Sequence, residues 1–422
     1  MKSCNPEDEP TKYRHRVLGL LSLLLVITYL DRVCLAIAGP RMQAALDISP
    51  VGWGWVTGVF TISYAMFEIP GGALGDRLGP RRVLTRIVVW WSVFTSLTGA
   101  VSNLSLLLLT RFCFGAGEAG AFPNTGVVIA RWFPPRKHTS AWGIAMAASQ
   151  LGGALAPFFV VPIQMRYGWR ACFFVFGGLG VAWATFWYWW FRDSPAEMPK
   201  VDPGEVAEIG ASSRAHRTLP WSIGIRSGNL WAVMAMVACY GYTLYFFQSW
   251  LPTYLVKGRG FTETGLLLSS LPFLVAAVAN GCGGFLSDAL VRRLGLKWGR
   301  RSLGVAGLGC AALLMAAAMV VQQKLWSLAF LSLSFGGITL QQPGVLGICL
   351  DIGGKYAGAV TGAMNTATFV AAFVSSVAYG YIVRSSGYDA PFLPMVVLLL
   401  ISALLWFRID ATQLVIPEPE SS

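Results

Sequence analysis

Charged residues are scarce in this chain. They make up 12% of its 422 residues, whereas 55% are hydrophobic, and a soluble domain usually carries about 25% charged residues. A soluble chain of this length would have too little polar surface to cover itself. The scarcity of charge therefore predicts an integral membrane protein of the all-α class, whose partner is the lipid bilayer.

Motifs for catalysis, nucleotide binding or metal binding are missing as well. The sequence contains no HExxH, no GxSxG, no CxxC pair and no GxxxxGK[ST] loop, so neither a zinc site nor a redox pair nor an ATPase is indicated. Most of the eight cysteines stand singly in apolar runs, where cysteine behaves as a small hydrophobe. We expect no enzyme activity, no cofactor and no metal, and any process that needs energy would have to draw on a gradient.

Histidine is absent from the apolar runs. All three histidines, His15, His138 and His216, lie outside them, so carboxylates would have to carry any proton through the membrane. The net charge of +12 comes from basic residues that cluster at the ends of apolar spans. That pattern is typical of membrane topology, and we expect no nucleic-acid partner.

Twelve apolar runs are long enough to cross a bilayer, which takes about 20 residues. They lie near 17–40, 52–74, 83–102, 104–130, 139–162, 169–191, 229–256, 263–290, 303–322, 325–350, 356–383 and 390–407. One long polar stretch follows the sixth run. The sequence therefore predicts a six-helix half over 1–191, a cytoplasmic linker over 192–228 and a second six-helix half over 229–422.

The distribution of basic residues predicts the orientation of the spans. With both termini in the cytoplasm, the inner segments hold 23 Lys and Arg residues and the outer loops hold seven. Such an excess on one side is the usual signature of the cytoplasmic face. We expect a multi-pass protein with both ends in the cytoplasm, and short loops favour a bacterial inner membrane.

The two halves also resemble each other. Three features recur at an offset of 212 residues: Gly71-Gly72 with Gly283-Gly284, Asp76 with Asp288, and Pro40 with Pro252. Internal repeats of this kind mark transporters whose halves move around a central site. The shared offset favours duplication over chance similarity between glycine-rich helices.

Five ionisable residues stand inside stretches that are otherwise apolar: Asp31, Arg32, Glu68, Arg111 and Glu118. A charge at the centre of a bilayer costs at least about 2.5–3.5 kcal/mol, so such residues face a protein interior or a water-filled path. The alternative is that they only pin helices together as buried pairs. We favour a functional site, because ionisable groups embedded in a membrane usually serve function.

Spacing constrains how these charges are arranged. Arg111 and Glu118 are seven residues apart on one helix, which places them on the same side and about 10 Å apart along the axis. Asp31 and Arg32 are neighbours and point roughly 100° apart, so each needs its own partner. We expect Asp31 to face Arg111 and Glu118, while Arg32 faces the cavity.

The loop Gly75-Asp76-Arg77-Leu78-Gly79-Pro80-Arg81-Arg82 resembles the signature loop of the major facilitator superfamily. Further motifs resemble its anion:cation symporter branch, which includes bacterial hexuronate, galactonate and glucarate transporters. They are Tyr29-Leu30-Asp31-Arg32, Ile69-Pro70-Gly71-Gly72, Arg111-Phe112-x-x-Gly115-x-Gly117-Glu118-Ala119, Trp250-Leu251-Pro252-x-Tyr254 and Gly362-x-Met364-Asn365-Thr366. The resemblance implies a proton-coupled importer of an organic anion, such as a sugar acid, that works as a monomer by alternating access.

By position in these motifs, the resemblance implies a role for each residue. Asp31 and Glu118 would be the proton-coupling sites, Arg32 would hold the substrate carboxylate, and Arg111 would be the charge partner of Glu118. The remaining expected residues are Tyr29, Tyr64, Gln150 and Asn365 for substrate binding, and Asp76, Arg77, Arg81 and Glu68 for gating. Glu68 could also be a third proton site.

Two departures from the family pattern leave the substrate open. Leu346 replaces a tryptophan, and the run after Asn365-Thr366 is Ala-Thr-Phe-Val-Ala-Ala. Another carboxylate, aromatic or dicarboxylic, is therefore an alternative to a sugar acid. An anion exchanger of the same fold and coupling to sodium also stay open.

Polar side chains in the seventh run are candidates of a weaker kind. Tyr240, Tyr242, Tyr245 and Gln248 would either contact substrate or bond neighbouring helices, because a buried tyrosine usually finds a hydrogen-bond partner.

Overall fold

The computed structural model describes residues 12–134, 137–198, 201–209 and 226–416, apart from the side chains of Ala73, Asp76, Thr139 and Lys355. Within these ranges the chain is helical and contains no strand. Local signals start several helices. Ser49 caps α2 through its side chain, with Pro50 as the first helical residue, and the Asn103 side chain caps α4.

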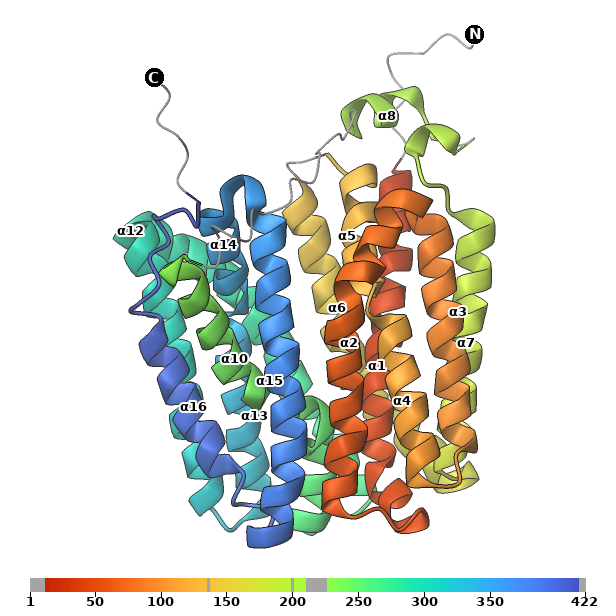
Figure 1. The fold of residues 1–422 in the computed structure, drawn as a ribbon, viewed down its shortest axis with the longest axis vertical. Coiled ribbons are helices and arrows are strands. Elements are labelled where there is room, and N and C mark those ends of the chain that lie inside the picture. The colour runs from red at the N-terminus through yellow and green to blue at the C-terminus, as the bar shows by residue number, and fades with distance from the viewer. Residues whose placement is uncertain (1–11, 135–136, 199–200, 210–225, 417–422) are drawn as a thin grey trace.

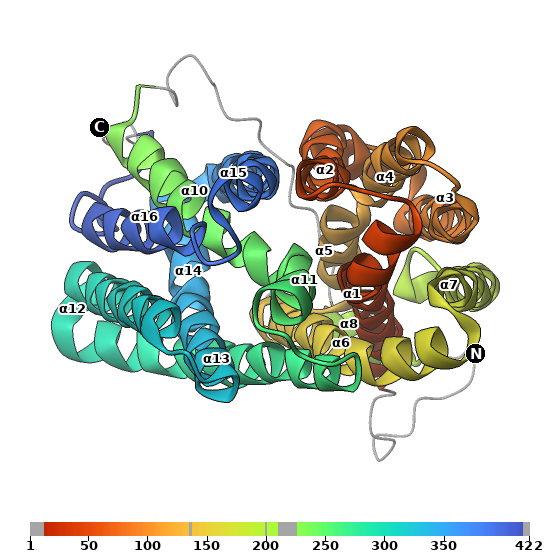
Figure 2. The same ribbon diagram turned by 90° about the horizontal axis from the view of Figure 1, so that it is seen from below.

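The helices form two groups, which we call the first and second bundles (Figures 1 and 2). The first comprises α1 (Tyr13–Ala45), α2 (Pro50–Leu78), α3 (Pro80–Ala100), α4 (Leu104–Glu118), α5 (Ala121–Trp132), α6 (His138–Tyr167) and α7 (Trp169–Trp190). The second comprises α10 (Gly228–Ser249), α11 (Leu251–Thr253), α12 (Ser270–Val320), α13 (Lys324–Leu340), α14 (Gln342–Gly353), α15 (Ala357–Ser386) and α16 (Phe392–Leu405). Short helical segments complete the description: η2 (Pro195–Glu197), α8 (Pro203–Ile209), η3 (Tyr254–Gly258), η4 (Thr264–Ser269) and η5 (Gly354–Tyr356).

Nine helical segments among the described residues are long and apolar enough to cross a membrane. Three of them are composite: α4 with α5, η4 with α12, and α13 with α14. α2 is not among the nine, and α16 has only 14 residues. The all-helical membrane architecture is therefore confirmed, whereas the number of twelve spans and the division at 191 and 229 stay predictions.

α12 is a helical hairpin. Gly295 has φ 78° inside it, in the left-handed region that favours glycine. A Cβ at Gly299 would lie 2.5 Å from the Cα of Val291, and Arg300 donates a hydrogen bond to Ser287 at 2.7 Å. The chain therefore turns back on itself at Gly295. Gly79, between α2 and α3, has the same kind of backbone, with φ 81°.

The two described ends of the chain lie on one face, which we call the terminal face (Figure 1). There α8 packs on the start of α1: the Glu205 carboxylate accepts hydrogen bonds from the backbone N–H groups of Tyr13 and Arg14, at 3.1 and 3.0 Å. These are helix N-terminal donors that have no partner within the helix. The Arg14 side chain and Lys137 hold Glu208, and hydrogen bonds from these two groups lower the pKa of Glu208 to about 2.

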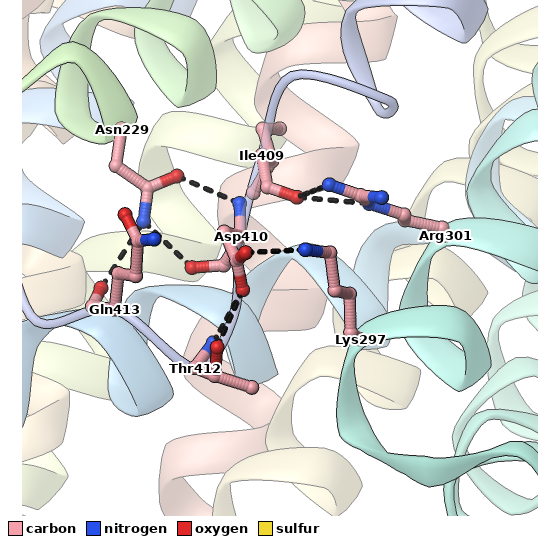
Figure 3. A network of polar contacts seen from close by, with 7 residues as sticks. All are labelled: Asn229, Lys297, Arg301, Ile409, Asp410, Thr412 and Gln413. Atoms are coloured by element: carbon pink, nitrogen blue, oxygen red, sulfur yellow. Dashed lines mark hydrogen bonds and ion pairs between the residues drawn. The ribbon is translucent and has the colours of Figure 1, made fainter.

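The segment after α16 is fastened to the terminal end of the second bundle (Figure 3). Lys297 forms an ion pair with Asp410 at 2.6 Å, and Asn229 bonds the backbone of Asp410. Hydrogen bonds from Lys297 and Thr412 lower the pKa of Asp410 to about 2. Arg301 donates to the Ile409 carbonyl at 2.8 Å. The residues after α16 therefore tie α10 to α12.

On the opposite, distal face the two bundles are joined by polar contacts. Arg41 at the end of α1 forms an ion pair with Glu263 at 2.5 Å and also donates to the carbonyl of Gln164. Next to it, Lys257 donates to Gln43 at 2.9 Å. Close packing adds to these contacts, since a Cβ at Gly380 would lie 2.5 Å from the Pro50 carbonyl oxygen. The distal face is closed in this conformation.

We expect removal of the Arg41–Glu263 pair to loosen this closure. The side chains are 32% and 38% exposed, so the pair contributes at most about 1 kcal/mol, or roughly a five-fold change in the opening equilibrium. The test introduces Ala36→Cys, with Cys282 and Cys310 replaced by serine, and measures its labelling by a water-soluble thiol reagent. Labelling should be up to about five-fold faster with Arg41→Gln or Glu263→Gln, whereas Arg166→Gln is the matched control. Equal labelling rates in all variants would contradict the assignment.

A second prediction concerns the Lys297–Asp410 pair. Because the pKa of Asp410 is lowered on folding, to about 2, the stabilisation is present above the unfolded value of about 3.9 and is lost as pH falls toward 2. Asp410→Asn should therefore speed amide hydrogen exchange over residues 409–416, with the same fold-change at pH 5 and pH 8. Asn229→Ala is the comparison that removes the backbone tether and keeps the ion pair. Exchange that is unchanged in Asp410→Asn would show that the pair does not hold the segment.

Candidate functional site

The side chains of Arg32 and Glu118 form a buried ion pair between α1 and α4. Arg32 Nε donates to Glu118 Oε1 at 2.6 Å, and a second guanidinium nitrogen lies 2.5 Å from the same oxygen. Glu118 has no exposed surface and Arg32 is 8% exposed. The second carboxylate oxygen of Glu118 is buried without a hydrogen-bond partner among the described residues. Each group thus compensates the other's charge inside an apolar interior.

The resemblance implied Arg111 as the charge partner of Glu118, whereas the bonded partner of Glu118 is Arg32. Arg111 acts on Glu118 electrostatically, so its role as charge partner stays a prediction. Arg32 reaches Glu118 from α1. Its guanidinium is therefore shared between this ion pair and the cavity.

Aromatic rings surround the Arg32 guanidinium. Its central carbon lies 5.0–5.8 Å from the ring centroids of four residues: Tyr29, Phe60, Tyr64 and Phe122. Cations over ring faces at this distance are attracted to them. Tyr29 and Tyr64 were expected in the substrate site, and the structure places both beside Arg32. A substrate anion on Arg32 would therefore meet ring surfaces as well as charge.

Arg111 lies on the rings of Phe60 and Phe114, at 4.9 and 4.4 Å from their centroids. It is 3% exposed, and its Nε has no hydrogen-bond partner among the described residues. No ion pair of a described residue involves its guanidinium. Glu118 and Asp31 act on it only through longer-range electrostatic interaction.

Asp31 lies where the spacing predicted, within the electrostatic influence of Glu118 and Arg111. Both carboxylate oxygens are buried, and neither has a hydrogen-bond partner in the described part of the chain. Trp91 and Thr95 on α3 lie beside the carboxylate, and their polar atoms also lack partners. The Asp31 carboxylate is thus buried beside polar groups of α3 and has no ion-pair partner among the described residues.

Glu68 and Asn365 connect the two bundles near the site. The Asn365 side-chain amide donates to Glu68 at 3.3 Å. One helical turn away, Tyr64 stacks on Phe369 with ring centroids 4.2 Å apart. Asn365 was expected to bind substrate and Glu68 to act in gating. In this conformation the Asn365 amide and the Glu68 carboxylate are hydrogen-bonded to each other.

A small cavity of about 20 Å³ lies between the bundles, enough for one or two water molecules. The first bundle contributes Arg32, Arg111 and Phe60 to its wall, and α10 contributes Tyr245, Gln248 and Ser249. The cavity extends from Arg32 toward the distal face, because its wall includes Leu35 and Ala36 from the next turn of α1. Gln150 on α6 does not line it, although its side-chain oxygen is buried without a partner in the described chain.

The signature loop between α2 and α3 is fastened within the first bundle. The Arg81 backbone N–H donates to Asp193 at 2.8 Å, and its guanidinium donates to the Tyr188 carbonyl at the end of α7. Arg77 is exposed, and the side chain of Asp76 lies outside the described residues. Gating by these residues therefore stays a prediction.

Some residues of the site were not assigned by sequence reasoning. Phe60, Phe122, Trp91 and Thr95 surround the buried charges, yet aromatic residues and threonine are common throughout the chain. Trp91 and Thr95 are four residues apart and share one face of α3. That shared face is the one sequence signal by which they could have been found. Of the weaker candidates in the seventh run, Tyr245 and Gln248 reach the cavity wall.

Comparisons with characterised proteins give a consistent result. The chain is 35% identical over 401 residues to a protein named probable sulfoacetate transporter SauU of Cupriavidus necator, covering 93% of each chain. It is 28% identical to the hexuronate transporter of Bacillus subtilis, covering 88% of each. It is also 28% identical to the probable galactarate/D-glucarate transporter GudP of Escherichia coli, covering 90% of this chain and 89% of that protein.

The same fold is found in a solved structure of a bacterial homolog of the human lysosomal transporter Spinster. That structure is in an inward-facing and unoccupied conformation. The TM-score is 0.78 at 18% sequence identity, over 96% of this chain and 98% of that one. The sequence profile of the Major Facilitator Superfamily matches residues 21–376. The resemblance found in the signature loop is thereby confirmed, and the chain belongs to the major facilitator superfamily.

Proposed function

We propose that this protein is a proton-coupled importer of an organic anion that works by alternating access. Arg32 binds an anionic group of the substrate, and Glu118 and Asp31 carry the protons. The observation that carries the proposal is the buried Arg32–Glu118 pair. An arginine that binds substrate and an acid that binds a proton share one contact, so the two events cannot be independent.

Coupling follows from competition for the Arg32 guanidinium. When Glu118 is ionised it occupies Arg32, and an arriving anion would meet a second negative charge. When Glu118 takes up a proton its hold on Arg32 weakens, and the anion can take its place. By linkage, bound anion favours the protonated acid to the same degree. Asp31, which lacks a bonded partner, supplies the second proton site.

The direction of transport and the membrane that holds the protein are part of the same proposal. Both described ends lie on the terminal face, which we place in the cytoplasm of a bacterial inner membrane in keeping with the distribution of basic residues. The distal contacts then close the outer side in this conformation. Glu68 and Asn365 would part when the inner side opens, and the signature loop, with Asp76, Arg77 and Arg81, would act when that side closes. A single chain contains all of these elements, so a monomer suffices.

A sugar acid of the hexuronate, aldonate or aldarate type is the first candidate substrate, supported by the hexuronate and galactarate/D-glucarate transporters among the relatives. A smaller organic anion is the second candidate. The small volume of the cavity and the similarity to a probable sulfoacetate transporter favour it. Tyr29, Tyr64 and Gln150 would complete the site when the bundles rearrange.

Neutralising either proton site should uncouple uptake. One pH unit corresponds to about 1.4 kcal/mol per proton, or about ten-fold in accumulation. In proteoliposomes with an inward gradient of one unit, Glu118→Gln and Asp31→Asn should each lower the accumulation ratio about ten-fold, while exchange of labelled for unlabelled anion persists. Glu197→Gln, at an exposed acid outside the site, is the control. Full accumulation in both variants would refute proton coupling through these residues.

The nature of the substrate is tested with a panel of solutes. Uptake of D-glucuronate, D-galactonate, D-glucarate, sulfoacetate, benzoate and D-glucose is measured with and without the proton gradient. We expect uptake of at least one anion, no uptake of glucose, and loss of uptake in Arg32→Gln, because the buried guanidinium is the counter-charge. If only a neutral solute were transported, the role of Arg32 would be wrong.

A further inference from the structure

Two arginines line the same cavity, and their surroundings differ. Arg32 is bonded to Glu118, whereas no ion pair or hydrogen bond of a described residue involves the Arg111 guanidinium. Arg111 is nevertheless 3% exposed. A buried guanidinium has five N–H donors to satisfy, and leaving them unbonded away from water is costly. The cavity wall is therefore short of an acceptor at Arg111.

Both guanidinium groups lie close to the ring of Phe60, which limits the distance between them. Arg32 lies 5.2 Å from its ring centroid and Arg111 lies 4.9 Å from it. These distances limit the separation of the two guanidinium carbons to about 10 Å. Both side chains reach the same cavity wall, so one small molecule with two ends could contact both.

Polar groups from the second bundle lie opposite Arg111. Tyr245, Gln248 and Ser249 of α10 line the cavity, and no hydrogen bond of a described residue uses the Tyr245 hydroxyl or the Gln248 amide. Thr57 of α2, also in the wall, already bonds the backbone of its own helix. The polar groups of α10 and the Arg111 guanidinium on α4 thus line the same cavity. This arrangement is typical of a binding site for an anionic group.

Charge accounting favours a substrate with two negative groups. The cluster contains the cations Arg32 and Arg111 and the acids Glu118 and Asp31, and Glu68 acts on Arg32 from outside the cavity. If both acids of the cluster bind protons, two cations are left without a counter-charge. One negative group would compensate only one of them, and an uncompensated buried charge is strongly unfavourable. Two negative groups compensate both.

We propose that Arg111 is a second anion-binding residue and that the substrate is a dianion, with one negative group on Arg32 and the other on Arg111. This inference rests on the proposed role of Arg32 in substrate binding. It replaces the expected pairing of Arg111 with Glu118, and it restricts the candidate substrates to dicarboxylates, aldarates and sulfonated carboxylates.

The test compares probes that differ by one charged group. Matched pairs are malonate with malonamate, succinate with succinamate, and D-glucarate with D-gluconate. Binding to the purified full-length protein in lipid nanodiscs is measured calorimetrically at fixed pH, without a gradient. For at least one pair we expect the wild-type protein to bind the dianion at least about ten-fold more tightly, because a charge-assisted contact in a buried site is gained.

Variants assign the preference to Arg111. Arg111→Gln should remove most of the preference for the dianion while changing the affinity for the monoanion less than about three-fold. Arg111→Lys keeps the charge and should keep part of the preference. Arg32→Gln should weaken both members of the pair.

Three results would overturn the proposal. The wild-type protein could show no preference for the dianion in any pair. Arg111→Gln could weaken the affinity for both members of a pair equally, or leave the preference for the dianion unchanged. The wild-type comparison and Arg111→Lys keep the test decisive if Arg111→Gln does not fold. Because binding is measured without a gradient, a failure of proton coupling in the uptake experiments would leave this result standing.

Discussion

The ion pair between Arg32 and Glu118 is the interaction on which the site depends. Neither group could stay charged in an apolar interior without a counter-charge, and together they join α1 to α4. Four aromatic rings hold the guanidinium in place. In the proposed mechanism an arriving anion takes the place of the carboxylate on Arg32. Substrate and ionised Glu118 therefore compete for Arg32, so that protonation of Glu118 favours anion binding.

The rest of the fold supports that exchange. The distal contacts, the Arg41–Glu263 pair among them, close one side of the molecule. The contact between Glu68 and Asn365 lies between the bundles on the other side of the ring pair Tyr64–Phe369. The buried charges thus sit between two sets of contacts that join the bundles. In the proposed mechanism these two sets of contacts open in turn, so that the site is reached from one face at a time.

Sequence reasoning predicted the membrane class, the all-helical fold, the family and the burial of the five charges, because apolar runs and signature loops are local properties. It implied Arg111 as the charge partner of Glu118, whereas the structure bonds Glu118 to Arg32 and leaves Arg111 acting on Glu118 electrostatically. It could not foresee Arg32 crossing from α1 to α4, the position of Asp31 beside Trp91, or Phe60 and Phe122 around the Arg32 guanidinium. Those contacts depend on how helices pack, which no single segment encodes.

Proton uptake on anion binding tests the central claim most directly. Purified protein in nanodiscs is mixed with D-glucarate or sulfoacetate in a weakly buffered solution, and an indicator dye records the pH change. The starting pH is high enough that the site is not protonated before the ligand is added. The account predicts that binding takes up protons, and that the double variant Asp31→Asn with Glu118→Gln binds without taking up any. Saturating binding to the wild-type protein with no change in proton content, over the whole range in which it transports, would contradict it.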